Sequence, residues 1–271
     1  MDSSRRSRAT RSHGGLFAAG AAAVGAAFIA LPVAGVLVRT PWSSFLADVG
    51  SPEARAATAL SLSTSVVAAA LAVLLGLPLA WVLARREFPG RRLVRAVVAV
   101  PMVLPPVVAG VALLGTFGRT NGVIGRMLFD ATGLQLTFSP AGVVVAQCFV
   151  ALPFFVLSAE AGIAQVDRRY EDVVATLGAR PAYAAGAVVL RLAAPALAAG
   201  ALLAWARALG EFGATITFAG NVEGRTQTLP LAVYLLLERD PGAAYALSAV
   251  LVGVAVSVLV LLRGRWLGAG R

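Results

Sequence analysis

Two ionisable residues, Arg207 and Glu211, lie four positions apart within a long apolar run. This spacing places both side chains on one face of a helix, where they can form an ion pair. Charged groups inside a membrane are costly and indicate a function by default. Thr215 and Thr217 follow, and their hydroxyls could donate hydrogen bonds to a passing anion. The four residues are therefore candidates for a translocation path or gate, and the chemistry they offer is binding.

Each of these candidates also has a structural interpretation. Arg207 and Glu211 could neutralise each other while facing the interior of a helix bundle. The threonine hydroxyls could bond to carbonyls four residues earlier in their own helix. An unpaired Glu211 would repel an anion, so Arg207 must at least neutralise it. Alternatively, the pair breaks and reforms as the path opens.

The chain lacks the residue sets of common catalytic and metal centres. Its only cysteine is Cys148 and its only histidine is His13, which excludes a Cys/His metal site and an internal disulfide. No nucleophile–base pair lies in an apolar run, so an enzyme is not expected. All 23 basic residues are arginine, so the chain cannot supply the lysine of a phosphate-binding loop. We expect this chain to bind no cofactor; if it takes part in an ATP-driven process, ATP, Mg²⁺ and ATP hydrolysis must be on another chain.

The composition indicates an integral membrane protein. Only 13% of the residues are charged and 59% are hydrophobic, whereas soluble domains carry about 25% charged residues. A helix needs about 20 apolar residues to cross the hydrocarbon core. We therefore predict an all-α fold with six transmembrane helices, in the runs Leu16–Val38, Ala59–Ala84, Ala96–Phe117, Ala141–Ser158, Ala193–Phe218 and Ala243–Leu262.

Three of these runs need a further comment. The third contains Pro101, Pro105 and Pro106, which should kink its helix because proline lacks the backbone donor. The first is longer than the roughly 7–15 apolar residues of a signal peptide and has no clear cleavage site, so we interpret it as an uncleaved helix. We take the fifth run, with both threonines, as one continuous helix.

The distribution of arginine predicts the topology. Of the 23 arginines, 16 lie in four segments that fall on one side of the membrane, Arg5–Arg11, Arg85–Arg95, Arg168–Arg191 and Arg263–Arg271. The positive-inside rule then places both termini in the cytoplasm. We divide the chain into a cytoplasmic tail at 1–15, a transmembrane domain at 16–262 and a second tail at 263–271. The basic charge is thus a topology signal, and we expect no nucleic-acid partner.

A polar segment, Tyr170–Arg180, separates the fourth and fifth runs within a loop at about 160–192. We interpret it as a helix outside the bilayer, to which a cytoplasmic partner could bind. Glu171 and Asp172 lie near its start, where acidic groups complement the helix dipole. Gly178 would let the chain turn after the helix. We therefore interpret the chain as a transporter subunit driven by a partner.

The residues Asp172-Val-Val-Ala-Thr-Leu-Gly178, followed by Val188-Val-Leu190 and Pro195, resemble the E-A-A-x-x-x-G…I-x-L-P loop of ABC importer permeases. The match is partial, because aspartate stands at the usual glutamate and Arg191 at the usual proline. The segment from Ala206 to Tyr234 resembles the oxyanion branch of these permeases, the molybdate/tungstate type above all, with sulfate/thiosulfate permeases as relatives. The resemblance extends over about 60–262.

This resemblance implies a type I ABC importer permease fold with a cytoplasmic coupling helix. It also implies a homodimer in the plasma (inner) membrane of a prokaryote, two ATPase subunits and an extracytoplasmic oxyanion-binding protein. The external face would receive that protein, with Arg119, Arg126, Arg225 and Arg239 as candidates to pair with its acidic patches. The residues expected to couple the chain to the ATPase are Glu171, Asp172, Ala175, Leu177, Gly178 and Arg180.

The implied substrate is molybdate or tungstate, and sulfate or thiosulfate is the alternative. An ion-coupled secondary transporter is the rival from a different class. Such a transporter would use intramembrane carboxylates, and here only Glu211 lies deep in a run, opposite Arg207. That rival would also leave the coupling-type loop unexplained.

Overall fold

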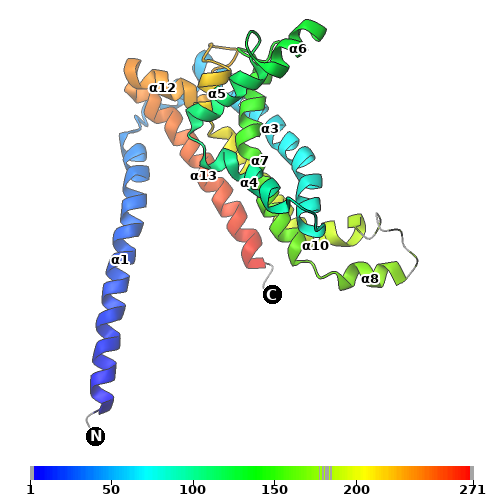
Figure 1. Ribbon diagram of the computed structural model, residues 1–271. Helices are drawn as coiled ribbons and strands as arrows, with labels where there is room; N and C mark the ends of the chain where they lie inside the picture. The colour runs from blue at the N-terminus through cyan, green and yellow to red at the C-terminus, as the bar shows by residue number, and fades with distance from the viewer. Residues whose placement is uncertain (1–2, 177, 179, 181–182, 184, 269–271) are drawn as a thin grey trace.

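The computed structural model describes residues 3–176, 178, 180, 183 and 185–268, and every regular element within these residues is helical (Figure 1). The elements are α1 (Ser3–Arg39), α2 (Phe45–Val49), α3 (Pro52–Arg85), α4 (Arg91–Val103), α5 (Pro106–Phe117), α6 (Val123–Thr132), α7 (Pro140–Gln165), α8 (Arg169–Thr176), the π-helix η1 (Ala185–Val189), α10 (Leu190–Leu209), α11 (Gly213–Phe218), α12 (Leu229–Arg239) and α13 (Pro241–Gly268).

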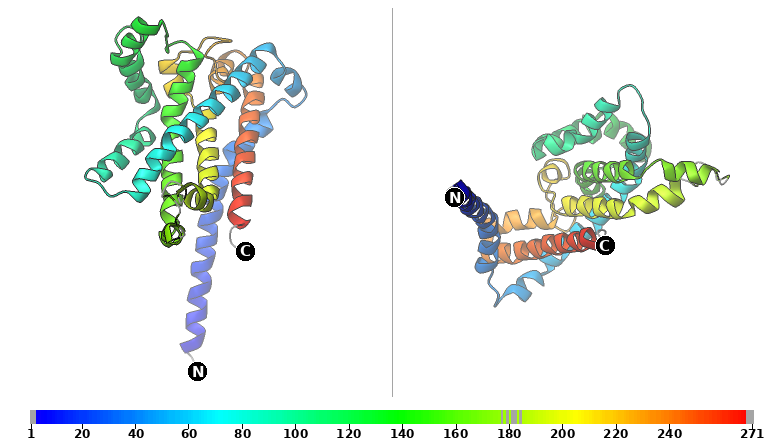
Figure 2. Two further views of the ribbon diagram at one scale, coloured as in Figure 1. Left: turned by 90° about the vertical axis from the view of Figure 1, so that its right-hand side faces the viewer. Right: turned by 90° about the horizontal axis from the view of Figure 1, so that it is seen from below.

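The helices α3, α7 and α10 pack against one another and form the centre of the bundle (Figure 2). Their contact faces consist largely of alanine and glycine, which let helix backbones approach closely in membranes. A Cβ added at Gly76 of α3, for example, would lie only 2.7 Å from Phe155 Cδ1 of α7. The outward faces carry exposed apolar residues such as Val66 and Leu74, which suit contact with lipid.

Five described helices are long and apolar enough to cross a membrane, and a sixth crossing exists if α4 and α5 count as one broken span. The prediction of an all-α membrane fold is thereby confirmed, and the six predicted runs compare with five or six candidate spans. The described structure also extends α1 back to Ser3 and α13 on to Gly268, so both expected tails continue the helices that they adjoin.

The third run is not one kinked helix, contrary to our expectation. α4 and α5 meet at a bend of 117°, and Leu104 and Pro105 between them are extended, with ψ of 135° and 136°. Both residues precede a proline, and a residue before proline is driven out of the helical region. Pro101 remains inside α4. Two consecutive pre-proline positions therefore turn the expected kink into a break.

The fifth run is also broken, and the expectation of one continuous helix was wrong. α10 ends at Leu209, and α11 begins at Gly213. Thr215 and Thr217 therefore lie on a short separate helix, beyond the break that follows Arg207.

The remaining helices flank this centre. α5 and α11 pack together beside α7, while α12, α13 and α2 gather at the N-terminal end of α3. α1 stands apart: its apolar stretch Ala18–Arg39 has no buried residue, and Figure 1 shows it running away from the bundle. Its end is attached through Thr40, whose Oγ1 donates to the carbonyl of Tyr245 at 3.3 Å.

The basic segments lie at one end of the molecule. Figure 1 shows the start of α1, the end of α13 and the helix α8 at its lower end, with α6 and α12 at the opposite end. The C-terminal end of α3 belongs to the lower end as well, because Arg85 contacts Glu171 of α8. The arginine-rich segments that the sequence assigned to one side of a membrane thus lie towards the same end of the molecule (Figure 1).

Candidate functional site

Arg207 and Glu211 form an ion pair at the break between α10 and α11. Arg207 Nη1 lies 2.5 Å from Glu211 Oε2, and the glutamate side chain is only 1% exposed, against 30% for the arginine. Arg207 occupies the last turn of α10, where a cation complements the helix dipole. The predicted spacing of the two residues therefore does produce contact.

Glu211 also organises the helix that follows. Its Oε1 accepts a hydrogen bond from the backbone N–H of Ala214 at 2.8 Å, which satisfies one of the free donors at the start of α11. A carboxylate at a helix N-terminus is favoured by the dipole as well. The side chain thus links the end of α10 to the start of α11 across the break.

The two threonines of α11 differ in their hydrogen bonding. Thr217 Oγ1 donates to the carbonyl of Gly213 at 2.9 Å, which is the back-bonding that threonine often makes in helices. Thr215 is fully buried, and its hydroxyl has no hydrogen-bond partner within the described part of the chain. Of the two hydroxyls, only that of Thr215 therefore has no hydrogen-bond partner among the described residues.

The two breaks in the bundle touch each other. A Cβ on Gly213, the first residue of α11, would clash with Cβ of Pro106, the first residue of α5. A Cβ on Gly110 of α5 would lie 2.5 Å from Cβ of Thr217. The ion pair, the threonines and the start of α5 consequently form one region, which we call the break site.

The coupling segment lies at the lower end of the molecule, and α8 projects from the bundle there (Figure 1). Glu171 and Asp172 are in its first turn, as the sequence predicts. Gly178 has a φ of +80°, the left-handed conformation that glycine adopts after a helix. Arg180 is exposed. Among the other predicted coupling residues, Leu177 lies outside the described residues, as does the side chain of Ala175.

The first-turn carboxylates of α8 have different surroundings. Glu171 Oε1 lies 3.2 Å from Arg85 Nη2, at the end of α3, whereas Asp172 is exposed. The aromatic ring of Tyr170 and the side chain of Val173 are also more than half exposed. Exposed apolar and aromatic groups on a helix outside the membrane indicate a surface that a partner covers.

A cavity of about 860 Å³ opens at the opposite end, beside α6. Arg119 and Arg126, two of the arginines predicted to face a binding protein, line it. The guanidinium of Arg119 stacks 4.1 Å above the ring of Phe129 and donates to Gln135 Oε1 at 3.1 Å. Arg126 pairs with Asp130 at 3.8 Å, and both side chains are exposed.

Sequence reasoning overlooked Arg85, Arg95 and Glu160 as site residues. The side chain of Glu160 is 9% exposed and pairs with Arg95. The predicted fourth run ended at Ser158, but α7 continues to Gln165. A carboxylate within an apolar helix is the signal that could have identified this residue.

Comparison with known proteins places these observations in context. A model of the family described as binding-protein-dependent transport system inner membrane component matches residues 72–268. The molybdenum transport system permease protein ModB of Mycobacterium tuberculosis is 47% identical over 239 residues, 88% of this chain and 90% of that protein. ModB of Escherichia coli is 38% identical over 211 residues, 78% of this chain and 92% of that protein.

Two further comparisons concern the substrate class and the fold. The sulfate transport system permease protein CysT of Escherichia coli is 35% identical over 228 residues, 83% of this chain and 80% of that protein. A chain of a bacterial alginate ABC transporter, crystallised with an alginate pentasaccharide-bound periplasmic protein, superposes with a TM-score of 0.72 at 16% identity. The superposition covers 95% of this chain and 94% of that chain.

Proposed function

The chain belongs to the family of binding-protein-dependent transport system inner membrane components, and on this premise we propose that it is the membrane permease subunit of an ATP-driven importer for molybdate. Its fold is that of a type I ABC importer permease. The observation that carries the choice of substrate is the 47% identity, over 88% of the chain, with a molybdenum permease. The sulfate permease that represents the alternative is 35% identical.

Transport is driven by ATP hydrolysis on a separate ATPase subunit that binds α8. The exposed Tyr170, Asp172 and Val173 on this projecting helix support such a contact. The chain itself binds no cofactor, and ATP and Mg²⁺ belong to the ATPase. Two ATPase subunits would serve two copies of the permease.

The membrane orientation follows from the clustered arginines. The end that carries α8, the start of α1 and the end of α13 faces the cytoplasm of a prokaryote, so both termini are cytoplasmic. The opposite face receives an extracytoplasmic oxyanion-binding protein. Arg119 and Arg126, at the cavity beside α6, provide positive charge there for acidic groups of that protein.

The anion passes through the bundle at the break site. Two broken spans that meet at Pro106 and Gly213 provide the irregular backbone that transporters place where it lines a passage. Arg207 neutralises Glu211 there, so that a dianion is not repelled, and the hydroxyl of Thr215 offers a weak donor. A weak site suits transport, because tight binding would slow release. Discrimination among anions then belongs to the binding protein.

Uptake of labelled molybdate tests this proposal. Cells that lack the chain should lose uptake and regain it when the chain is returned. Tungstate in excess should compete with the label, whereas sulfate in the same excess should not. Competition by sulfate would make the chain a sulfate permease, and loss of uptake on adding a protonophore at constant ATP would favour the secondary transporter.

A further inference from the structure

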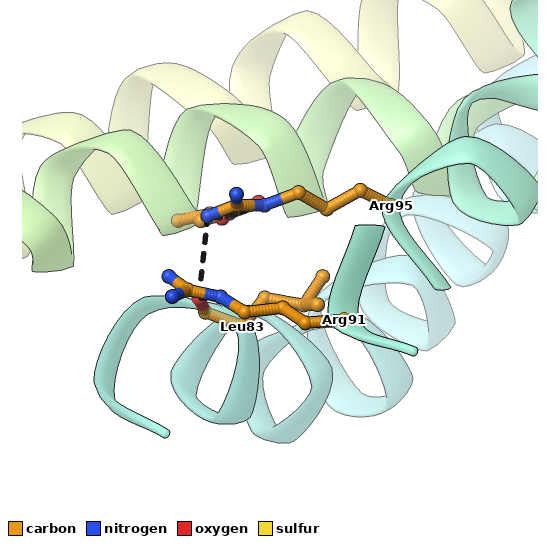
Figure 3. Close-up of polar contacts among 4 residues, drawn as sticks. Leu83, Arg91 and Arg95 are labelled. Atoms are coloured by element: carbon orange, nitrogen blue, oxygen red, sulfur yellow. Dashed lines mark hydrogen bonds and ion pairs between the residues drawn. The ribbon is translucent and has the colours of Figure 1, made fainter. Parts of the chain in front are cut away.

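The C-terminal end of α3 is a point where two other segments of the chain are attached, α4 and the coupling segment. The last carbonyls of a helix have no partner within the helix. Here the carbonyl of Leu83 accepts from Arg91 Nε at 2.8 Å and from Arg95 Nη2 at 3.4 Å (Figure 3). Both arginines belong to α4. Basic groups at this position also complement the dipole of α3.

Arg85, two residues further on, makes the attachment to the coupling segment. Its Nη2 donates to the carbonyl of Val166 at 2.9 Å and lies 3.2 Å from Glu171 Oε1. In return, Arg168 Nη2 donates to the carbonyl of Arg85 at 3.2 Å. The Arg85 side chain is only 8% exposed, so this ion pair is shielded from water more than an ordinary surface pair. We refer to Leu83–Arg85 as the α3 junction.

On its other side, the junction holds α4, the inner half of the broken span. No residue of α4 is fully buried, and its apolar contact with the central core is limited to the partly buried Val94 and Val98. Arg95 instead connects it to the carboxylate of Glu160 on α7 and to the carbonyl of Leu83. A helix with few buried apolar contacts can shift more readily than one embedded in a packed core. α4 is therefore the part of the bundle that a movement of the junction would displace.

We infer that Arg85 is the positioning residue that carries a displacement of α8 into the bundle, through the α3 junction to α4. This inference rests on the proposed function, since it needs an ATPase that moves α8. The inference gives the two carboxylates in the first turn of α8 different roles. Glu171 fastens α8 to α3 through Arg85, while the exposed Asp172 remains free to meet the ATPase. The coupling of ATP hydrolysis to transport then depends on a contact within this chain as well as on the contact between chains.

The test uses the complete transporter, with its ATPase and binding protein, reconstituted in liposomes. ATP hydrolysis and molybdate uptake are measured together for Arg85→Gln, Glu171→Gln and the matched control Arg86→Gln. Arg86 is adjacent and exposed, and its side chain makes no ion pair or hydrogen bond with the described residues. We expect both pair variants to hydrolyse ATP but to import at least about fivefold less molybdate per ATP, the lower end of typical coupling between sites. The control should keep the wild-type ratio.

A charge exchange separates positioning from general stability. Arg85→Glu combined with Glu171→Arg should import more molybdate per ATP than either single reversal, because the attraction is restored. If Arg85→Gln does not assemble, Glu171→Gln still tests the pair, because the latter side chain is 29% exposed. Wild-type ratios in both neutral variants would overturn the inference while leaving the transporter intact. Absence of ATP-dependent uptake in the wild type would instead overturn the proposed function, and the inference with it.

Discussion

Glu211 engages each of its carboxylate oxygens with a different partner, one with Arg207 and one with the N–H of Ala214. A carboxylate that is 1% exposed would be strongly destabilising without such partners. The arginine is less dependent on the pair, since 30% of its side chain is exposed, against 1% for the glutamate. Loss of its partner should therefore cost more free energy for Glu211 than for Arg207.

This inequality predicts an asymmetric response to substitution. Arg207→Gln leaves a buried carboxylate without its cation and should lower the stability of the purified protein by about 3–5 kcal/mol. Glu211→Gln keeps an oxygen for the Ala214 N–H and leaves only a partly exposed cation, so we expect about 1 kcal/mol. Thermal unfolding in detergent measures both. Equal losses, or a larger loss for Glu211→Gln, would contradict this account of the pair.

The hydroxyl of Thr215 offers a second comparison at the residue scale. Thr215→Val removes a buried hydroxyl that has no partner in the described part of the chain, so stability should change by less than about 1 kcal/mol. Molybdate uptake should fall several-fold because the anion loses a donor. Thr217→Val is the control, since that hydroxyl already bonds to Gly213 and uptake should persist. Normal uptake in Thr215→Val would remove this hydroxyl from the path.

Single residues differ in how far the sequence could predict them. The contact between Arg207 and Glu211 follows from helical periodicity over four positions. Arg95 and Glu160 are 65 positions apart, and no local pattern states that α4 folds back onto α7. In the sequence, Arg85 is one of the arginines that indicate the membrane topology, and no local pattern sets it apart. Its burial against α8 depends on where the end of α3 lies in space, which only the packing of α3 on α7 determines.

The elements were predictable as apolar runs but not as breaks. Length and hydropathy indicate each membrane crossing, and proline indicates a disturbance in the third. The size of that disturbance depends on two consecutive pre-proline residues, Leu104 and Pro105, both extended. The second break has no proline, and Glu211 stabilises it by capping a new helix. A local motif cannot distinguish such a carboxylate from a member of an ordinary helical pair.

The contact between the two breaks makes a prediction at the scale of elements. Gly213→Ala would place a methyl group against Pro106, and overpacking of this kind typically costs about 1–3 kcal/mol. Gly115→Ala on α5 is the control, because a Cβ there meets nothing within 4 Å. We expect a lower melting temperature and reduced uptake for the first variant only. Equal melting temperatures for the two variants would show that α5 and α11 are not closely packed.

The turn after α8 gives another prediction at this scale. Gly178 has a φ of +80°, whereas proline is locked near −65°. Gly178→Pro should therefore misplace the coupling segment and uncouple ATP hydrolysis from uptake while the protein stays in the membrane. Gly178→Asn should retain coupling, because asparagine tolerates the left-handed region. Undiminished uptake in the proline variant would remove this turn from the coupling mechanism.

The molecule as a whole presents more apolar surface than one chain can cover. None of the residues in Ala18–Arg39 is buried, and Leu93 and Val97 of α4 are exposed on the broken span. Lipid can cover some of this surface. In the homodimer that we propose, a second copy of the chain would cover part of the remainder. In this proposed complex, the basic lower end and the projecting α8 would meet the ATPase from the cytoplasm, and the cavity beside α6 would face the binding protein.

Gentle purification of the tagged chain from native membranes, followed by mass identification and stoichiometry of its companions, tests the central claim most directly. We predict two copies of this chain with two ATPase subunits, together with an extracytoplasmic protein that binds molybdate in preference to sulfate. If the chain is recovered without an ATPase in several mild detergents, the ATP-driven importer is contradicted, and the secondary transporter takes its place.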